Sequence, residues 1–465
     1  MKNQLLKDFP LVFEIQGDHL TPITIMKKLS GEKKFLLESS HKHQENGRFS
    51  FIGADPTIEL KSFGKEVEVI KEEGGRTTFI GNPLDITKEM LSHKRKLDCS
   101  VPFVGGAVGY VGYDIARHFE NIGNLLNDPL NMPDVHLMFY EVIIAFDHLE
   151  QKILIIGNPL ENSTLECIGK KMQMRKEQIE APFTEPVGDE SEKGKFVPYI
   201  SKELFMERVK EAKKYIESGD LFQIVLSQRM KAKFKGDPFQ FYRKLRIQNP
   251  SPYMFFVDFG EYTLAGSSPE SLVKVEGRTV YTNPIAGTKK RGRDKQEDEF
   301  LENELRTDPK EIAEHRMLVD LGRNDLGKVC EFGTVSVNKY MQVEKFKHVM
   351  HIVSEAQGQL REGLNALDAL ASCLPAGTVA GAPKIRAMQL INDIEESKRG
   401  VYGGAIGYIS ADGNMDFALA IRTMLVKGDE AYIQAGAGIV YDSDPEQEYE
   451  ETINKLRGFL GGNSC

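Results

Sequence analysis

Two pairs of glutamates, each spaced three residues apart, are the feature of this 465-residue sequence that most directly suggests chemistry. Glu311 and Glu314 lie in EIAEHR, and Glu448 and Glu451 lie in EYEE, with Lys455 two turns beyond Glu448. Residues three apart share one face of a helix, so each pair would present two carboxylates together. Four carboxylates on two helices could hold a hard divalent cation such as Mg²⁺. The alternative is two solvated helix faces, where glutamate is common.

Glycine-rich turns and isolated basic residues form a second group. LPAGTVAGAPKIRAM (374–388) leads from a turn into a helix whose free N–H groups could bind an anion, and QAGAGIVYDSDP (434–445) could present N–H groups similarly. Each is otherwise an ordinary tight turn. Arg422, in the strand-like run ALAIRTMLV, needs a carboxylate partner from the protein or from a ligand. His351 is either a core histidine or a functional one.

The elements that must position these residues follow from the apolar pattern. LKSFGKEVEVI, HLMFYEVIIAFDH and KILIIGNP predict strands, and SKELFMERVKEAKKYIESGD has helical spacing. The segment 253–284 predicts a series of strands, and 294–322 predicts two helices separated at Asp308-Pro309. The last helix begins at Asp444-Pro445. Strands and helices do not alternate strictly, so we expect an α+β fold rather than a doubly wound parallel sheet.

A charged stretch with Pro and Gly, KEQIEAPFTEPVGDESEKGK (176–195), predicts a linker or exposed loop. We therefore divide the chain into an N-terminal domain (1–180), a linker (181–196) and a second domain (197–465).

The bulk composition is that of a soluble globular protein, with 40% hydrophobic and 28% charged residues. A net charge of −9 disfavours a general nucleic-acid binder but allows a local basic pocket. The five cysteines form no CxxC pair, so neither a disulfide framework nor a structural zinc site is expected. The first twenty residues lack an apolar signal core, and no apolar run is long enough to span a membrane. We expect a cytoplasmic protein.

Ordered motifs along the chain resemble the chorismate-utilising enzyme family, most specifically between about residues 200 and 460. The matching stretches are DLFQIVLSQR, SSPES, NPIAGTKKRG, EHRMLVDLGRNDLGKV, HVMHIVS, LPAGTVAGAPKIRAM, YGGAIGY, AIRTM, QAGAGIVYDSDPEQEYEET and NK. The resemblance implies a large antiparallel β-sandwich core flanked by helices, with an N-terminal regulatory half. It also implies that residues 197–465 bind chorismate and carry out the catalysis.

The resemblance implies a role for each matching residue. Glu314 and Glu451 match the glutamates that bind Mg²⁺, with Glu311 and Glu448 supporting them, and the ion would sit on the ring carboxylate of chorismate. The substrate-binding residues implied in the same way are Gly377 and Thr378 at the ring carboxylate, Tyr402, Arg422, Gly438 and Lys455 at the enolpyruvyl carboxylate, and Gly287, Thr288 and Gly436 along the same site.

The implied catalytic residues are Glu270, His351 and Thr378. Glu270 in SSPES matches the acid that protonates the leaving C4 hydroxyl as ammonia adds at C2, which requires a raised pKa. His351 matches the base that removes the C2 proton as pyruvate is eliminated. Mg²⁺ can withdraw electron density from the ring through the carboxylate.

Two positions select the branch of the family. Water-adding relatives carry a lysine base where this chain has Gln223, which cannot act as that base. Relatives with a PIKGT motif use its lysine as a nucleophile, and this chain has Ala286 there. We therefore expect direct attack by ammonia and a lyase that forms anthranilate and pyruvate for tryptophan biosynthesis. The alternatives are an amino-chorismate enzyme that stops before elimination, and a catalytically silent tryptophan sensor or scaffold.

The resemblance also implies regulation and a partner. FLLESS (35–40) and NPSPYMFF (249–256) resemble a tryptophan feedback site between the domains; the alternative is a strand end and an ordinary Pro turn. No glutaminase is visible within the chain, so a separate glutamine amidotransferase subunit would supply ammonia, contacting the N-terminal domain. The implied tryptophan-site residues are Glu38, Ser39, Pro250, Tyr253 and Met254.

Overall fold

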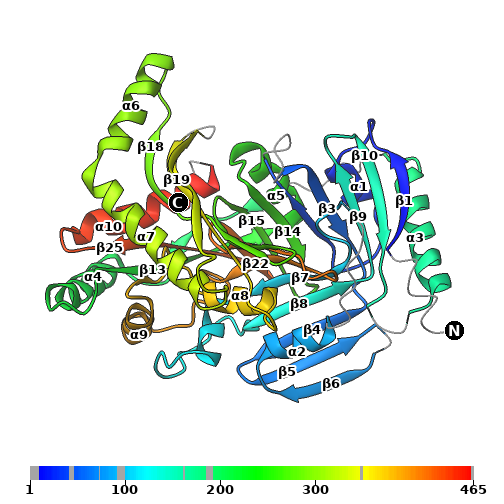
Figure 1. Cartoon of the computed structure of the whole chain (residues 1–465), viewed down its shortest axis with the longest axis horizontal. Helices are drawn as coiled ribbons and strands as arrows, with labels where there is room; N and C mark the ends of the chain where they lie inside the picture. The colour runs from blue at the N-terminus through cyan, green and yellow to red at the C-terminus, as the bar shows by residue number, and fades with distance from the viewer. Residues whose placement is uncertain are drawn as a thin grey trace.

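Two antiparallel β-sheets pack against each other, and helices cover their outer faces (Figure 1). No helix among the described residues is long and apolar enough to cross a membrane. The described cysteines Cys167, Cys330 and Cys373 are free thiols, whereas Cys99 and Cys465 lie outside the described residues. The computed structural model describes residues 10–40, 47–72, 74–91, 100–160, 163–184, 192–345 and 349–461.

The first sheet joins the beginning of the chain to strands from its second half. Along its path the order is β1-β10-β9-β3-β2-β14-β15-β24-β25-β13-β11, with β12 and β21 also paired to β13. Its strands are β1 (Leu11–Gln16), β2 (Phe35–Glu38), β3 (Phe49–Gly53), β9 (Val142–Asp147), β10 (Lys152–Gly157), β11 (Glu192–Lys193), β12 (Val197–Pro198), β13 (Gln223–Lys235), β14 (Tyr253–Asp258), β15 (Tyr262–Ser268), β21 (Gly381–Ala382), β24 (Thr423–Lys427) and β25 (Glu430–Ile439).

The second sheet mixes the two halves of the chain as well. Its order is β18-β20-β17-β16-β23-β22-β7-β8-β4-β5-β6, with β19 paired to β20. Its strands are β4 (Ile58–Phe63), β5 (Glu66–Lys71), β6 (Arg76–Ile80), β7 (Gly106–Val111), β8 (Val135–Tyr140), β16 (Ser271–Glu276), β17 (Thr279–Thr282), β18 (Ile285–Lys290), β19 (Ser336–Lys345), β20 (Val349–Gln359), β22 (Ala405–Ser410) and β23 (Met415–Leu419).

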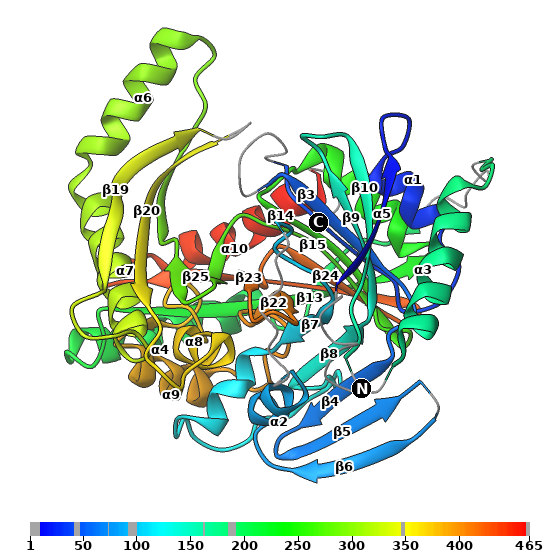
Figure 2. The same ribbon diagram turned by 45° about the vertical axis from the view of Figure 1, so that its right-hand side comes forward.

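The helices lie outside the sheets. Helices α1, α3, α5 and α10 pack on the first sheet, and α2, α7 and α8 pack on the side of the second. Helix α6 projects from the body together with β18, β19 and β20 (Figure 2). The helices are α1 (Pro22–Lys28), α2 (Pro83–Met90), the 3₁₀ helix η3 (Tyr113–His118), α3 (Leu165–Glu180), α4 (Lys202–Glu217), α5 (Pro238–Gln248), α6 (Lys295–Thr307), α7 (Pro309–Gly327), α8 (Ala366–Cys373), α9 (Lys384–Ile394) and α10 (Pro445–Leu460).

Strands from both sides of the predicted linker share each sheet. In the first sheet β2 pairs with β14, and in the second β7 pairs with β22. The segment 181–196 itself contains β11, which pairs with β13. The predicted boundary therefore does not separate two sheets, and the two halves of the chain build one continuous sandwich. The predicted α+β fold with an antiparallel β-sandwich is confirmed.

The space between the sheets is filled by large apolar and aromatic side chains from both halves, among them Phe35, Phe103 and Tyr408. Phe103 lies 5.5 Å from Phe51 and 4.7 Å from Tyr408, between ring centroids. Aromatic pairs at such separations contribute about 0.5–1.5 kcal/mol each beyond their burial. This core fixes the two sheets against each other and so holds the loops at their ends in place.

The predicted helix boundaries at the glutamate pairs are confirmed. Helix α6 ends before Asp308, and α7 begins at Pro309, because proline cannot continue a helix but suits its first turn. Helix α10 begins at Pro445 after Asp444 in the same way.

Candidate active site

The first glutamate pair lies at the start of α7. The carboxylate of Asp308 accepts the backbone N–H groups of Lys310 (2.9 Å) and Glu311 (3.3 Å), a cap worth about 1 kcal/mol. This cap fixes the first turn, from which Glu311 and Glu314 project on one face. Burial raises the pKa of Glu311, and the charges of Glu314 and Asp308 raise it further. The pair therefore concentrates carboxyl groups whose mutual repulsion the charges of Lys310 and Lys289 offset only in part.

The second pair lies at the start of α10, where burial raises the pKa of Glu448. A hydrogen bond from Ser443 lowers that pKa, while the neighbouring charge of Glu451 raises it. Glu448 Oε2 is buried and has no hydrogen-bond partner within the described residues. The charge of Lys310, from α7, also acts on Glu448, so the N-terminal ends of the two helices are close.

The two pairs are neighbours but not a closed cluster. Gln223 Nε2, on β13, donates to Glu314 Oε1 at 3.4 Å, and a β-carbon on Gly438 would lie 2.6 Å from the same nitrogen. Within the described residues, no three His, Cys, Asp or Glu side chains are close enough to hold a metal ion as they stand. The donors are oxygen atoms only, and one of them, on Glu448, is buried and unpaired. This donor set fits a hard divalent cation.

Glu270 occupies the turn between β15 and β16. Thr378 Oγ1 donates to Glu270 Oε1 at 2.8 Å, and the Glu270 carbonyl accepts the N–H of Leu419 at 3.0 Å. Burial raises the pKa of Glu270 to about 7, although the Thr378 hydrogen bond and the charges of Arg422 and Lys455 oppose it. A carboxyl group with this pKa can carry a proton near neutrality and deliver it.

His351 lies on β20, where its Nδ1 is 3.0 Å from the Gly287 carbonyl and 3.0 Å from Thr288 Oγ1. Because a carbonyl only accepts, Nδ1 carries the hydrogen of that bond, and burial lowers the pKa of His351. The neutral ring then has its lone pair on Nε2, as a base requires. Gly287 has φ +70, and a β-carbon there would lie 3.0 Å from Glu311 Oε2. His351 is thereby connected to the first glutamate pair.

Arg422 does not lie in a strand, contrary to the reading of ALAIRTMLV. It occupies the bend between β23 and β24 with φ +48, and its carbonyl accepts the N–H of Ser267 at 3.1 Å. A local pattern cannot show such a bend, because the flanking residues are apolar on both sides. Surrounding protein lowers the pKa of Arg422 by desolvation, yet its side chain remains open to solvent. Such a combination is expected of a group that lines a cleft.

Lys455 completes the cationic side of the site. Its Nζ lies 2.7 Å from Glu451 Oε1 and donates to the Gly436 carbonyl at 2.9 Å. The Tyr402 hydroxyl also faces Gly436, where a β-carbon would come within 2.7 Å of it. The glycines of β25 thus leave room beside a lysine and a phenol.

The structure joins the predicted catalytic, metal and substrate-binding residues through these contacts. Gly377, next to Thr378, lies against α7, since a β-carbon there would be 2.6 Å from Leu321. The sequence did not predict that Gln223 contacts Glu314 and adjoins Gly438. There it stood out only because relatives have a lysine at its position. No local signal marks Gln223 as a bridge, because Glu314 and Gly438 are both distant in the sequence.

A second cavity, of about 300 Å³, lies at the predicted tryptophan site. Glu38, Ser39, Tyr253 and Met254 line it, whereas Pro250 does not and Pro252 takes its place. Pro252 directly precedes β14, which carries Tyr253 and Met254 into the cavity wall, whereas Pro250 lies two residues earlier.

Charged residues that the sequence did not mark also line this cavity, and they come from both sheets and their ends. Lys274 and Asp416 belong to β16 and β23, and Arg48 lies before β3. Burial raises the pKa of Asp416 to about 6. The sequence does hold a signal for them: Lys274 interrupts the apolar residues of SLVKVE, and Asp416 interrupts those of MDFAL.

Comparison with known proteins gives one consistent match. A family model described as chorismate binding enzyme matches residues 32–461. Anthranilate synthase component 1 of Acetivibrio thermocellus is 45% identical over 98% of this chain and 96% of its own length. The protein of that name from Lactococcus lactis is 45% identical, over 96% and 98%. The crystal structure of anthranilate synthase component I from Streptococcus pneumoniae superposes with a TM-score of 0.82 at 44% identity, covering 96% of this chain and 98% of that one.

Proposed function

The chain belongs to the chorismate binding enzyme family, among the anthranilate synthase component 1 proteins, and we propose that it converts chorismate and ammonia to anthranilate and pyruvate for tryptophan biosynthesis. One observation carries the proposal: Glu270, with a pKa raised to about 7, lies within the electrostatic reach of Arg422 and Lys455. A proton donor beside two cations suits a doubly anionic substrate with a poor leaving group.

Substrate binding would use both ends of the site. Arg422 and Lys455 would hold the enolpyruvyl carboxylate, with Tyr402 donating from the side of Gly436. Thr378 and Gly377 would contact the ring carboxylate. Glu311, Glu314, Glu448 and Glu451 would hold Mg²⁺, which when bound withdraws electron density from the ring through that carboxylate.

The amination step would need one proton from the protein. Glu270 gives its proton to the C4 hydroxyl oxygen, which leaves as water while the ring double bonds shift. The nitrogen of ammonia bonds to C2 and then loses a proton to solvent. The Thr378 hydroxyl, 2.8 Å from Glu270 Oε1, holds the carboxyl in place during this transfer.

The elimination step would need a base. His351, neutral because burial lowers its pKa, takes the C2 proton on Nε2. The electron pair left at C2 aromatises the ring, and the bond between the ring and the enolpyruvyl oxygen breaks. The enolate that leaves takes a proton from solvent at its methylene carbon and becomes pyruvate. The Gly287 carbonyl and Thr288 hydroxyl, each 3.0 Å from Nδ1, orient the imidazole.

Two residues support ammonia over other nucleophiles. Ala286 is buried on β18 at the position of the lysine nucleophile of PIKGT relatives, and it offers no nucleophilic atom. Gln223 is engaged with Glu314 and cannot take a proton from water. Both features favour direct attack by ammonia.

The test supplies the purified chain with chorismate, Mg²⁺ and ammonium salt at alkaline pH and follows anthranilate fluorescence and pyruvate. We expect equal amounts of both products, and no signal from Glu451→Gln. Accumulation of an amino-chorismate that needs a separate lyase would instead support the enzyme that stops before elimination.

We further infer that tryptophan binds in the cavity of about 300 Å³ and inhibits the reaction. Its wall offers acidic groups for an ammonium, basic groups for a carboxylate and the Phe51 and Tyr253 rings for an indole. In Ser39→Phe a large ring would fill the cavity, so tryptophan should inhibit that variant at least tenfold more weakly than wild type. Equal inhibition of wild type and Ser39→Phe by tryptophan would show that tryptophan does not bind in this cavity.

The component 1 name of the relatives supports a second component, and we infer that it is a glutamine amidotransferase that supplies ammonia. The chain alone should then use ammonium salts but not glutamine. Glutamine-dependent activity of the isolated chain would contradict this.

A further inference from the structure

Arg399, in the segment between α9 and β22, is 3% exposed and crosslinks two segments that build the site. Its Nη1 donates to the Val379 carbonyl at 2.6 Å, and its Nη2 donates to the Val225 carbonyl at 2.7 Å. Val379 directly follows Thr378, whose hydroxyl contacts Glu270, and Val225 belongs to β13. A single side chain thus ties the turn that carries Thr378 to the sheet.

The charge of Arg399 is fully compensated within the protein. Its Nε donates to Glu395 Oε2 at 2.8 Å and its Nη2 to Glu395 Oε1 at 2.6 Å. Burial alone would lower the pKa of Arg399, but the Glu395 carboxylate raises it overall. Glu395 is held in turn by the backbone N–H and hydroxyl of Ser227, at 2.8 and 3.0 Å. A guanidinium that is permanently charged and internally paired is unavailable to a substrate, so its role must be exerted through its neighbours.

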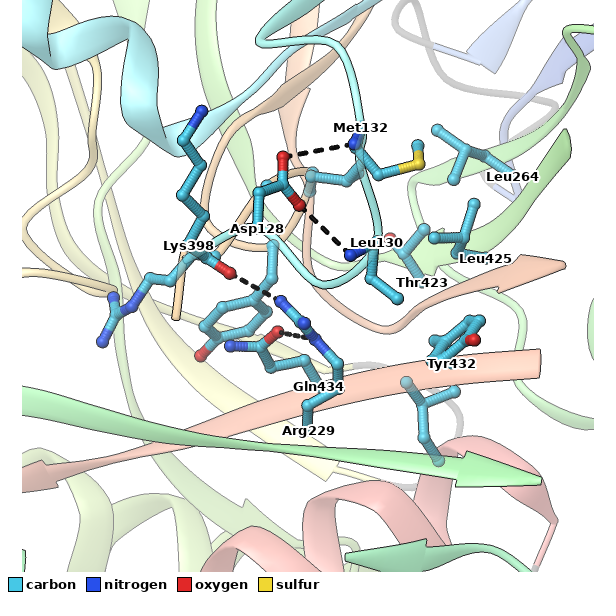
Figure 3. A pocket seen from close by; sticks show the side chains of 16 residues that line it. Asp128, Leu130, Met132, Arg229, Leu264, Lys398, Thr423, Leu425, Tyr432 and Gln434 are labelled. Carbon is cyan, nitrogen blue, oxygen red and sulfur yellow. Dashed lines mark hydrogen bonds between the residues drawn. The ribbon is translucent and has the colours of Figure 1, made fainter. Parts of the chain in front are cut away.

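The polar network continues behind the site. Gln434 donates to the Ser227 hydroxyl at 2.8 Å. Arg229 donates to Gln434 at 3.1 Å and to the Lys398 carbonyl at 2.7 Å (Figure 3). These groups border a cavity of about 40 Å³, which Arg399 and Tyr402 also line. The network is therefore joined to Arg399 through Ser227, which binds Glu395.

Two aromatic rings enclose the guanidinium. Its Cζ lies 4.8 Å from the centroid of Tyr113 and 5.6 Å from that of Tyr402. Cations over aromatic faces at these distances are attracted by the ring, more strongly where water is excluded. The Tyr402 hydroxyl in turn reaches Gly436 in the site.

We propose that Arg399 is a positioning residue for the proposed reaction: it fixes the turn of Thr378 and the ring of Tyr402, so that the Thr378 hydroxyl reaches Glu270. The proposal rests on the proposed function for its catalytic meaning, but its geometry is independent of the product formed. Lysine cannot replace Arg399, because a single ammonium cannot bind a carboxylate at two points and reach two separate carbonyls in one plane.

The first experiment follows protonation of Glu270 without turnover. Infrared difference titration records protonated carboxyl bands in wild type, and the band missing in Glu270→Gln identifies Glu270. Thr378→Val removes a hydrogen bond that lowers the pKa of Glu270, so that pKa should rise. Arg399→Lys keeps the positive charge but releases the turn, and should raise the same pKa. If Arg399→Lys does not fold, Glu395→Gln, which weakens the hold on the guanidinium, should shift the pKa in the same direction.

Arg175→Lys is the matched control. Arg175 is 4% exposed, donates to the Ser30 and Ala54 carbonyls and pairs with Asp55, far along the chain from Glu270. It should lower the melting temperature and leave the Glu270 band unchanged.

The second experiment is kinetic. Arg399→Lys should lower kcat with ammonia at least tenfold with a smaller change in KM for chorismate, because the proton donor and not the carboxylate clamp is displaced. The effects of Thr378→Val and Arg399→Lys should be less than additive in the double variant. A Glu270 titration identical in wild type and Arg399→Lys would overturn the proposal. If wild type formed no anthranilate, the proposed function would be contradicted instead. The infrared titration of Glu270 would still decide the role of Arg399.

Discussion

The pKa of Glu59 and the pKa values of the glutamates in the candidate active site are shifted in opposite directions. Glu59, on β4, is 4% exposed and lies 2.6 Å from His136 Nε2 and 3.2 Å from the Lys61 ammonium, with Lys33 also bound to it. Despite the cost of burial, these partners hold the pKa of Glu59 well below its usual range. At the candidate active site, burial and neighbouring carboxylates raise the pKa values of Glu311 and Glu448.

The difference distinguishes a structural cluster from a proposed cation-binding site. Around Glu59 the protein supplies the countercharges itself, so the cluster is complete and has no use for a ligand. Around Glu311 and Glu448 the neighbouring lysines offset the negative charge only in part, and we propose that a divalent cation supplies the remainder.

Replacing Glu270 by glutamine should reduce kcat by about 10²–10⁴, because the amide keeps the size of the side chain but cannot give a proton. Anthranilate fluorescence under saturating chorismate and Mg²⁺ measures the effect. A variant that retains wild-type kcat would exclude Glu270 as the acid.

Glu59→Gln should destabilise the protein by about 1.5–3 kcal/mol, since it weakens the hydrogen bonds that Lys33, Lys61 and His136 make to this buried carboxylate. Urea unfolding measures the loss. The active fraction should keep its kcat, because Glu59 supports the fold and not the site. A large loss of kcat in the fully folded variant would show that Glu59 also acts on the active site, which would contradict this distinction.

The pH dependence of stability should reveal Glu270. Its pKa is raised to about 7 in the folded protein from about 4.3 in an unfolded chain. A raised pKa stabilises the fold fully below the unfolded value, and that contribution is lost as pH rises through about 7. Relative to Glu270→Gln, wild type should therefore lose up to about 3 kcal/mol of unfolding free energy between pH 4.5 and 8. A constant difference across this range would contradict the raised pKa.

The same pKa sets the pH profile of the reaction. At a fixed concentration of free ammonia, kcat should fall as pH rises through the pKa of Glu270, because the proton is lost. Rates that keep rising above this pH at constant free ammonia would contradict the assignment.

Glu448→Gln should raise stability slightly, by a few tenths to about 1 kcal/mol, while abolishing activity. It removes repulsion from Glu451 and the burial cost of a charge without disturbing the helix. Thermal unfolding without divalent ions measures the gain. A clear loss of stability would place Glu448 among the structural carboxylates.

The sequence predicts the elements better than their assembly. Pro309 and Pro445 mark helix starts because proline acts locally, and SSPES and the glycine motifs mark the site through their resemblance. The pairing of β2 with β14 depends on contacts between distant segments, which no local pattern encodes. Arg399 was missed because ESKRG reads as a solvated charged turn, whereas the fold buries its guanidinium between two tyrosines.

We propose above all that Glu311, Glu314, Glu448 and Glu451 bind a divalent cation. Equilibrium binding of Mn²⁺, followed by its electron paramagnetic resonance signal and competed with Mg²⁺, tests it directly in wild type, Glu448→Gln and Glu59→Gln. We predict one competable ion per chain in wild type and in Glu59→Gln, and at least tenfold weaker binding in Glu448→Gln. Equal binding by wild type and Glu448→Gln, or none in wild type with chorismate present, would contradict the claim.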